Sequence, residues 1–138
     1  MINQDFEPFV KLVSDENVIF KKQGSFAEKK GLILLTNRRI IGIEFKYKGT
    51  LSRKIDGYKK VGFESNINDI SFVEIIETNF GKFGVDIYSI YRSVDRDQKI
   101  SIFFRDNDDA NTLYKELSAL LTILRARKEL QETTRKSG

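Results

Sequence analysis

The chain has 138 residues, with 24 Lys and Arg against 20 Asp and Glu, 40% hydrophobic residues, and neither Cys nor His. This composition is typical of one globular domain, and it excludes disulfides, thiolate or imidazole metal sites and catalysis by a Cys or His side chain. The sequence shows no secretory signal and no apolar run long enough to span a membrane, so we expect a cytoplasmic, non-enzymatic protein without a cofactor.

Residues 5–14 are expected to form a short N-terminal helix, because their apolar residues recur at the helical spacing i, i+3, i+4, i+7. These residues are Phe6, Phe9, Val10 and Val13. A helix this short is marginal alone and must dock. It could cover the second, half-apolar face of the hairpin described next, or the open mouth of a β-barrel. A turn over residues 14–17 then leads into a strand over residues 18–26.

Residues 31–45 are predicted to form a β-hairpin that turns at Asn37-Arg38, because Asn tolerates the backbone of two-residue hairpin turns. The register places Leu32, Leu34, Ile41, Ile43 and Phe45 on one face, which we assign to the core. The other face is apolar only near the turn, and something should cover it. It is a candidate interaction face and consists of Ile33, Leu35 and Ile40.

A basic segment follows the hairpin. Residues 21–60 hold twelve Lys and Arg against three acids. Residues 46–60 are predicted to be a loop or frayed hairpin, with a short strand near residues 58–64. Its cations could bind anionic lipid head groups, with Tyr47, Leu51 and Tyr58 reaching the interface; the alternative is a solvated loop. The candidate residues are Lys46, Lys48, Arg53, Lys54, Lys59 and Lys60.

The rest of the chain reads as three strands and a long helix. The strands are expected over residues 68–77, 85–92 and 99–105. Asp106 or Asn107 should cap a helix that runs to about Leu130. Asp108 and Asp109 fit its first turn better than a calcium site, which needs a Gly and a distal Glu. The apolar stripe of the helix outlasts a small sheet, so residues 125–138 should overhang the domain, with a frayed end from Thr133.

This order of elements indicates an α+β, mainly β fold in a single domain over residues 1–138. Three segments sharpen it: Gly31-Leu32-Ile33-Leu34-Leu35-Thr36-Asn37-Arg38-Arg39-Ile40-Ile41, Asn68-Asp69-Ile70-Ser71-Phe72-Val73-Glu74, and Ile100-Ser101-Ile102-Phe103-Phe104 followed by Asp109-Ala110 and the Leu113-to-Leu121 helix. Together they resemble the bacterial members of the pleckstrin-homology (PH) superfamily and the related GRAM domains. The resemblance covers residues 17–124 and implies a PH-like antiparallel barrel or sandwich of about seven strands, capped by the C-terminal helix.

The resemblance does not name a ligand, because this superfold carries lipid-binding, peptide-binding and oligomerisation modules. We favour a non-catalytic binding and assembly module that recognises a protein and self-associates. The overhanging end of the helix, with Ile123 and Leu130, could dock on another subunit. The alternative is peripheral binding to anionic lipids, at the inner face of the membrane, through residues 46–60. The loop that joins the first two strands, residues 27–30, is short, and this disfavours stereospecific phosphoinositide binding. Nucleic-acid binding is disfavoured because few aromatic residues are available to stack on bases.

The hairpin tip has two interpretations. Asn37 makes the turn in both. Arg39, beside Arg38, binds an anionic ligand in the first interpretation. In the second, Arg39 pairs locally with an acid such as Asp69 or Glu74.

Overall fold

The computed structural model describes residues 6, 9–49, 54–91 and 96–137. The described chain forms one antiparallel sheet in the order β4-β3-β2-β1-β7-β6-β5, followed by a long C-terminal helix. The elements are β1 (Val18–Phe26), β2 (Lys29–Thr36), β3 (Arg39–Tyr47), β4 (Ile55–Asn66), the short 3-10 helix η1 (Ile67–Asp69), β5 (Ile70–Glu77), β6 (Phe83–Tyr91), β7 (Arg96–Phe103) and α1 (Asn107–Ser137). The predicted mainly β, α+β class is confirmed.

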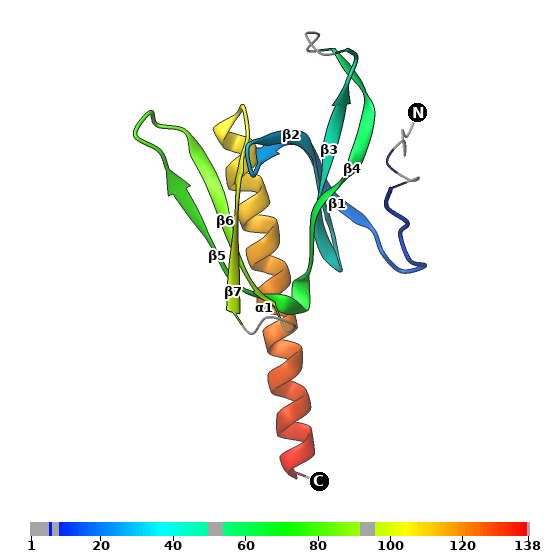
Figure 1. Cartoon of the computed structure of the whole chain (residues 1–138). Helices are drawn as coiled ribbons and strands as arrows, with labels where there is room; N and C mark the ends of the chain where they lie inside the picture. Colours follow the sequence, from blue (N-terminus) through cyan, green and yellow to red (C-terminus); the bar gives the residue numbers. More distant parts are fainter. Residues whose placement is uncertain (1–5, 7–8, 50–53, 92–95, 138) are drawn as a thin grey trace.

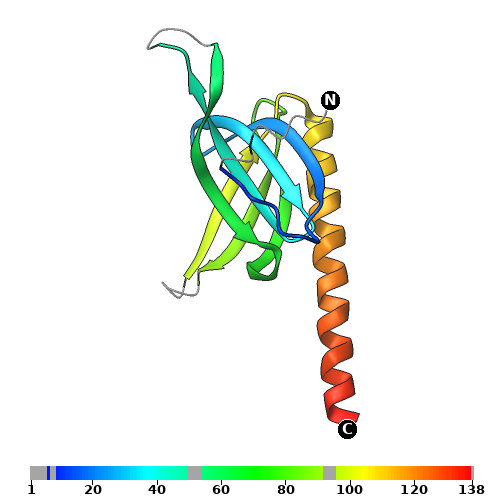
Figure 2. The same ribbon diagram turned by 90° about the vertical axis from the view of Figure 1, so that its right-hand side faces the viewer.

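The sheet bends into two halves, β1–β4 and β5–β7 (Figure 1). The halves are joined where β1 pairs with β7 through Ser25–Phe103 and Phe26–Ile102. At another place they approach again, since the hydroxyl oxygens of Ser65 in β4 and Ser89 in β6 lie 2.8 Å apart. The first part of α1 lies along one side of the bent sheet, and its C-terminal part projects beyond it (Figures 1 and 2).

The main core lies between the two sheet halves and α1. Side chains of α1, including Leu113 and Leu117, meet the inward residues of both halves there. Ile33, Leu35 and Ile40 belong to this core and have no exposed surface. The prediction that these three residues form an interaction face is therefore wrong. Their cover comes from the same chain, because the bend in the sheet turns this side of β2 and β3 inward.

A second apolar cluster lies on the outer face of β2 and β3. The N-terminal segment covers this face, with Phe6 only 1% exposed and Val10 only 2%. It was expected on the opposite face, which α1 and the other half of the sheet cover instead. The sheet residues beneath it are Leu32, Leu34, Ile41, Ile43 and Phe45. Both faces of this hairpin are thus buried. Its predicted register is observed, with Leu34 opposite Ile41 and Leu32 opposite Ile43.

The N-terminal segment is not the predicted helix in its described part. The backbone N–H groups of Phe9 and Val10 donate to the Phe6 carbonyl, at 2.9 and 3.0 Å, and make a single turn. Residues 10–13 then have no regular structure. The Lys11 carbonyl accepts a hydrogen bond from Arg39 Nη2 at 2.6 Å, so a contact with the sheet takes the place of a helical bond. Residues 7 and 8 lie outside the described part.

Two other segments are more ordered than predicted. The region expected to be a loop or frayed hairpin contains the first residues of β4, which pair with β3 as far as Tyr47 opposite Ile55. Together, the ends of β3 and β4 form an arm that projects from the sheet (Figure 1). The helix also continues to Ser137, where a frayed end was expected from Thr133.

Candidate interaction sites

The tip of the β2–β3 hairpin holds the loop that precedes β1. Asn37 Oδ1 accepts a hydrogen bond from the Asn17 N–H at 2.7 Å, and Asn37 Nδ2 donates to the Asp15 carbonyl at 3.0 Å. Arg38 forms an ion pair with the Asp15 carboxylate. Asn37 therefore does more than permit a tight turn, since its side chain fastens residues 15–17 to the tip.

Arg39 lies at the centre of this attachment. Its Nε and Nη2 atoms donate to the two carboxylate oxygens of Glu16, at 2.8 and 3.1 Å. Nη2 also donates to the Lys11 carbonyl, and Nη1 donates to Glu64 Oε1 at 3.3 Å. Arg39 thus pairs locally with acids, but with Glu16 and Glu64 rather than Asp69 or Glu74. All three guanidinium nitrogens already donate within the chain, which disfavours the anion-binding interpretation.

The Glu16 carboxylate is buried and saturated with donors. Besides Arg39, it accepts hydrogen bonds from the Thr36 hydroxyl at 2.6 Å and from the Val13 N–H at 3.1 Å. Burial alone would raise the pKa of Glu16, but these hydrogen bonds outweigh it and hold the pKa below its ordinary value of 4.5. The hydrogen bond to Glu16 raises the pKa of Arg39. Both groups are therefore charged at neutral pH, and we call this pair the Glu16–Arg39 clamp.

A groove of about 610 Å³ runs beside the clamp, between the hairpin tip, the N-terminal segment, the end of β4 and α1. Its charged lining residues are Lys11, Asp15, Glu16, Arg38, Arg39, Glu64 and Arg127. The acids among them are already paired, Asp15 with Arg38 and both Glu16 and Glu64 with Arg39. Such a mixture of paired charges does not favour one class of ligand.

The predicted basic residues lie on the projecting arm and along β4. Lys46, Lys48, Lys54, Lys59 and Lys60 are all exposed, while Arg53 and Leu51 fall outside the described residues. Lys60 Nζ lies 3.9 Å from the carboxylate of Glu44. Tyr47 and Ile55 face each other across the arm, and they are 36% and 42% exposed.

Tyr58 does not reach outward as predicted. Its ring stacks on Phe45, with centroids 5.8 Å apart, and meets the edge of Phe9 at 6.1 Å. It therefore belongs to the outer apolar cluster, where burial of its ring stabilises the N-terminal segment on the sheet.

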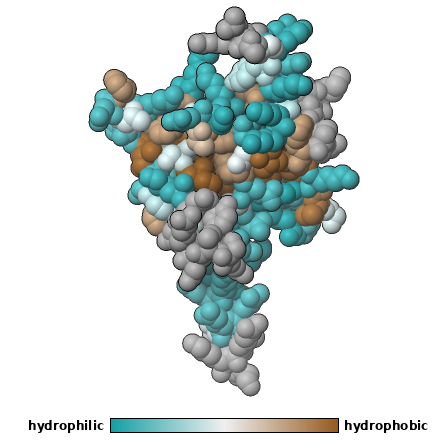
Figure 3. Space-filling model, in the orientation of Figure 1, coloured by the Kyte–Doolittle hydropathy of each residue, from teal (hydrophilic) through white to brown (hydrophobic). Residues whose placement is uncertain are grey.

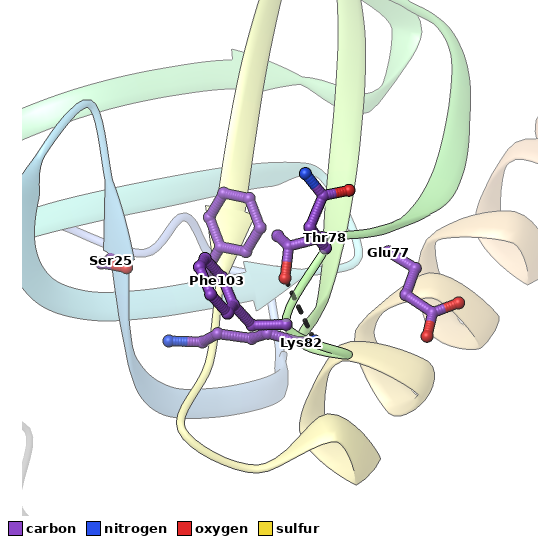
Figure 4. Close-up of a pocket in the computed structure, with 7 residues that line it drawn as sticks. Ser25, Glu77, Thr78, Lys82 and Phe103 are labelled. Carbon is purple, nitrogen blue, oxygen red and sulfur yellow. Dashed lines mark hydrogen bonds between the residues drawn. The ribbon is translucent and has the colours of Figure 1, made fainter.

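The β5–β6 turn exposes an aromatic residue that sequence reasoning missed. Phe80 is 97% exposed. It borders an open pocket of about 580 Å³ whose wall also includes Ser25 of β1, Phe103 of β7 and Lys82 (Figure 4). The turn is closed by the Lys82 N–H, which donates to Thr78 Oγ1 at 3.1 Å (Figure 4). The only sequence signal was an aromatic residue directly before a turn glycine, Gly81.

The acids at the start of α1 cap the helix. Asp106 Oδ1 accepts a hydrogen bond from the Asp108 N–H at 2.9 Å, as an N-cap does. The next residue, Asn107, accepts from the Phe83 N–H and donates to the Gly81 carbonyl, so the helix start is fixed to the β5–β6 turn. No group of three or more acidic residues that could hold a metal ion occurs in the described part of the chain.

The overhang of α1 begins where Leu124 makes the last contact of the helix with the main core. Arg125 Nη2 then donates to the Ser71 carbonyl of β5 at 2.5 Å. From there to Thr133 every side chain is exposed, including Leu130 at 69%, and Ile123 just before is 49% exposed. Figure 3 shows mostly hydrophilic residues on the side of the overhang drawn there. Among the described helices, none is both long and apolar enough to cross a membrane.

Comparison with known proteins bears on the fold. No family model matches this sequence, and no curated protein matches it. One similar solved structure is the complex of PDZ-RhoGEF DH/PH domains with GTP-γ-S-activated RhoA, at 11% sequence identity and a TM-score of 0.52. The similarity covers 80% of this chain but only 30% of that chain. At this identity the likeness concerns the fold alone, and together with the seven antiparallel strands and the C-terminal helix it shows that this chain has a PH-like fold.

Proposed function

We propose that this protein is a non-catalytic binding module that associates with a second copy of itself and recognises a protein partner. The observation that carries the proposal is the overhang of α1, which exposes Leu130, together with Ile123 just before it. A helical segment of about a dozen residues is marginal in water by itself, because most helical stability in proteins comes from packing an apolar face. Contact with another chain would supply that packing.

Ile33, Leu35 and Ile40 are buried and offer no surface to a second copy, so self-association would use α1. Recognition of a protein partner is supported by analogy alone, since the similar DH/PH structure is a complex with RhoA.

Light scattering coupled to size-exclusion chromatography tests self-association. We expect the apparent mass to rise from monomer to dimer as the concentration goes from low to several hundred micromolar. Leu130→Glu should abolish the rise, because it places a charge in the contact. Gln131→Glu is the matched control, since it adds the same charge at the neighbouring exposed position. A monomer throughout this range would overturn the proposal.

A second candidate function is peripheral binding to an anionic membrane through the arm. It is favoured by the exposed Tyr47–Ile55 pair, which lies among exposed lysines such as Lys46 and Lys48. Each lysine near an acidic bilayer contributes about 1 kcal/mol, and an aromatic ring is stabilised at the lipid interface.

Sedimentation with phosphatidylserine-containing vesicles tests this candidate. We expect binding at low salt that weakens at high salt and is lost in the double variant Lys46→Glu with Lys48→Glu. The control is Lys115→Glu with Lys128→Glu, which makes the same charge change on the exposed surface of α1. Equal binding by both double variants, or no binding by the unaltered chain at low salt, would refute the role of the arm.

A further inference from the structure

The helix α1 carries two apolar stripes, and only one of them faces the domain. The stripe in the main core includes Leu113, Leu117 and Leu121. The other consists of Ala119, Ile123, Ala126 and Leu130, all of which are exposed. At 3.6 residues per turn, the two stripes point about 150° apart around the helix axis. The second stripe therefore faces away from the domain and continues into the overhang.

The second stripe has the spacing of a helix-pairing seam. Its residues are separated by four, three and four positions, which is the alternation of a and d sites in a heptad. The two a positions hold the large residues Ile123 and Leu130. The two d positions hold the small residues Ala119 and Ala126. Large and small side chains thus alternate along the seam.

We propose that the stripe binds the same stripe of a second copy in the antiparallel direction. In this register Ala119 lies opposite Leu130 of the partner subunit, and Ile123 lies opposite Ala126 of the partner subunit. The proposal rests on the proposed self-association and specifies its surface and direction. Each layer of the contact then combines one large and one small side chain, which is how facing positions fill space without voids.

The parallel arrangement is disfavoured by the same residues. It would set Ala119 against Ala119 and leave an underfilled layer. It would also place Glu116, one turn before Ala119 on the same seam, against the Glu116 of the partner subunit, so that two like charges meet. In the antiparallel register Glu116 faces Thr133 of the partner subunit. The stripe therefore fits the same stripe of a second copy that runs in the opposite direction, as an isologous two-fold contact requires.

The shape of the molecule permits this pairing. Each domain lies on the opposite side of α1 from the stripe, and the helix runs along one edge of the molecule (Figure 2). The overhang of one copy would run beside residues 112–124 of the other copy. The part of the helix that extends past the sheet would then be packed against another helix. About seven side chains per copy take part, against about 20–30 in a standard interface, so we expect a dissociation constant in the micromolar range.

Disulfide trapping tests the direction, because the chain has no Cys of its own. Two single variants, Ala119→Cys and Leu130→Cys, are made on copies that differ in size by a tag. The copies are mixed at several hundred micromolar, oxidised mildly and separated without reductant. In the antiparallel register these two positions meet, while two copies of position 119 lie about 16 Å apart along the axis, as do two copies of position 130.

We expect the mixed-size dimer to form at least tenfold faster than either same-size dimer. Same-size dimers formed preferentially would indicate a parallel pair and overturn the proposal. If light scattering of the unaltered chain shows a dimer but no disulfide forms at these positions, this stripe is not the interface, although self-association stands. A monomer by light scattering overturns both proposals.

Discussion

The Glu16–Arg39 clamp makes a quantitative prediction about stability. In Glu16→Gln the side chain keeps its size but loses its charge and one acceptor oxygen. Arg39 therefore loses its buried charged partner and one of its two hydrogen bonds to this side chain. The Arg39 side chain is only 17% exposed, and its remaining acidic partner, Glu64, is 44% exposed. Hydrogen bonds to charged groups are worth about 1.5–3 kcal/mol each, and breaking a buried pair costs about 3–5 kcal/mol. We expect the free energy of unfolding to fall by about 3 kcal/mol, measured by urea denaturation at neutral pH.

The pH dependence separates this electrostatic cause from a packing defect. The folded-state pKa of Glu16 lies below its ordinary value of 4.5, so its contribution is fully present above the unfolded pKa and is lost as the pH falls through the folded pKa. The difference between the unaltered chain and Glu16→Gln should therefore be constant from about pH 6 to 8 and shrink below about pH 4.5. Asp15→Asn is the control, since the Arg38–Asp15 pair is exposed and its loss should leave stability unchanged within error. A difference that persists undiminished in acid would refute the clamp as described.

Three further changes have expected outcomes in the same denaturation assay. Ala27 and Glu28 occupy left-handed backbone in the β1–β2 turn, with φ of 49° and 63°, so replacing them by Asn-Gly should stabilise the protein by about 1–2 kcal/mol; a loss of stability would contradict the turn geometry. Gly31→Ala should destabilise by more than about 2 kcal/mol, because its Cβ would lie 2.1 Å from the Ile43 carbonyl oxygen, and a neutral result would show that the strands are farther apart. Phe6→Ala should cost about 3 kcal/mol if the N-terminal segment covers the sheet, and a negligible cost would show that it does not.

The sequence was sufficient for the elements that local periodicity determines. The strand β1 begins and ends at the predicted residues 18 and 26, because polar turn residues lie directly before and after it in the sequence. The β2–β3 register also followed, since an Asn-containing two-residue turn fixes which residues face each other. The start of α1 was predictable from its acidic cap, and the overhang from an apolar stripe longer than the domain.

The features that the sequence did not predict depend mostly on contacts between segments that are distant in the chain. Both faces of the β2–β3 hairpin are apolar, so alternation could not decide which face meets the helix and which meets the N-terminal segment. Glu16 and Arg39 are 23 positions apart, and nothing local to either indicates the other. Residues 5–14 have helical spacing, yet the single turn in which Phe9 and Val10 donate to the Phe6 carbonyl is enough to bring Phe6 and Val10 onto the sheet. Phe80 was missed because a lone turn residue has no periodic pattern.

The burial of both hairpin faces changes where an interaction should be sought. The most apolar stretch of the chain is used entirely for folding, with one side in the main core and the other beneath Phe6, Val10 and Leu12. Arg39 at the tip of the hairpin is also used for folding, since the Glu16–Arg39 clamp holds the N-terminal segment in place. Exposed apolar side chains occur instead at Phe80, on the arm and on the overhang of α1, among other places. Of these, the overhang alone combines exposure with a periodic, self-complementary pattern, so α1 is where a binding partner should first be tested.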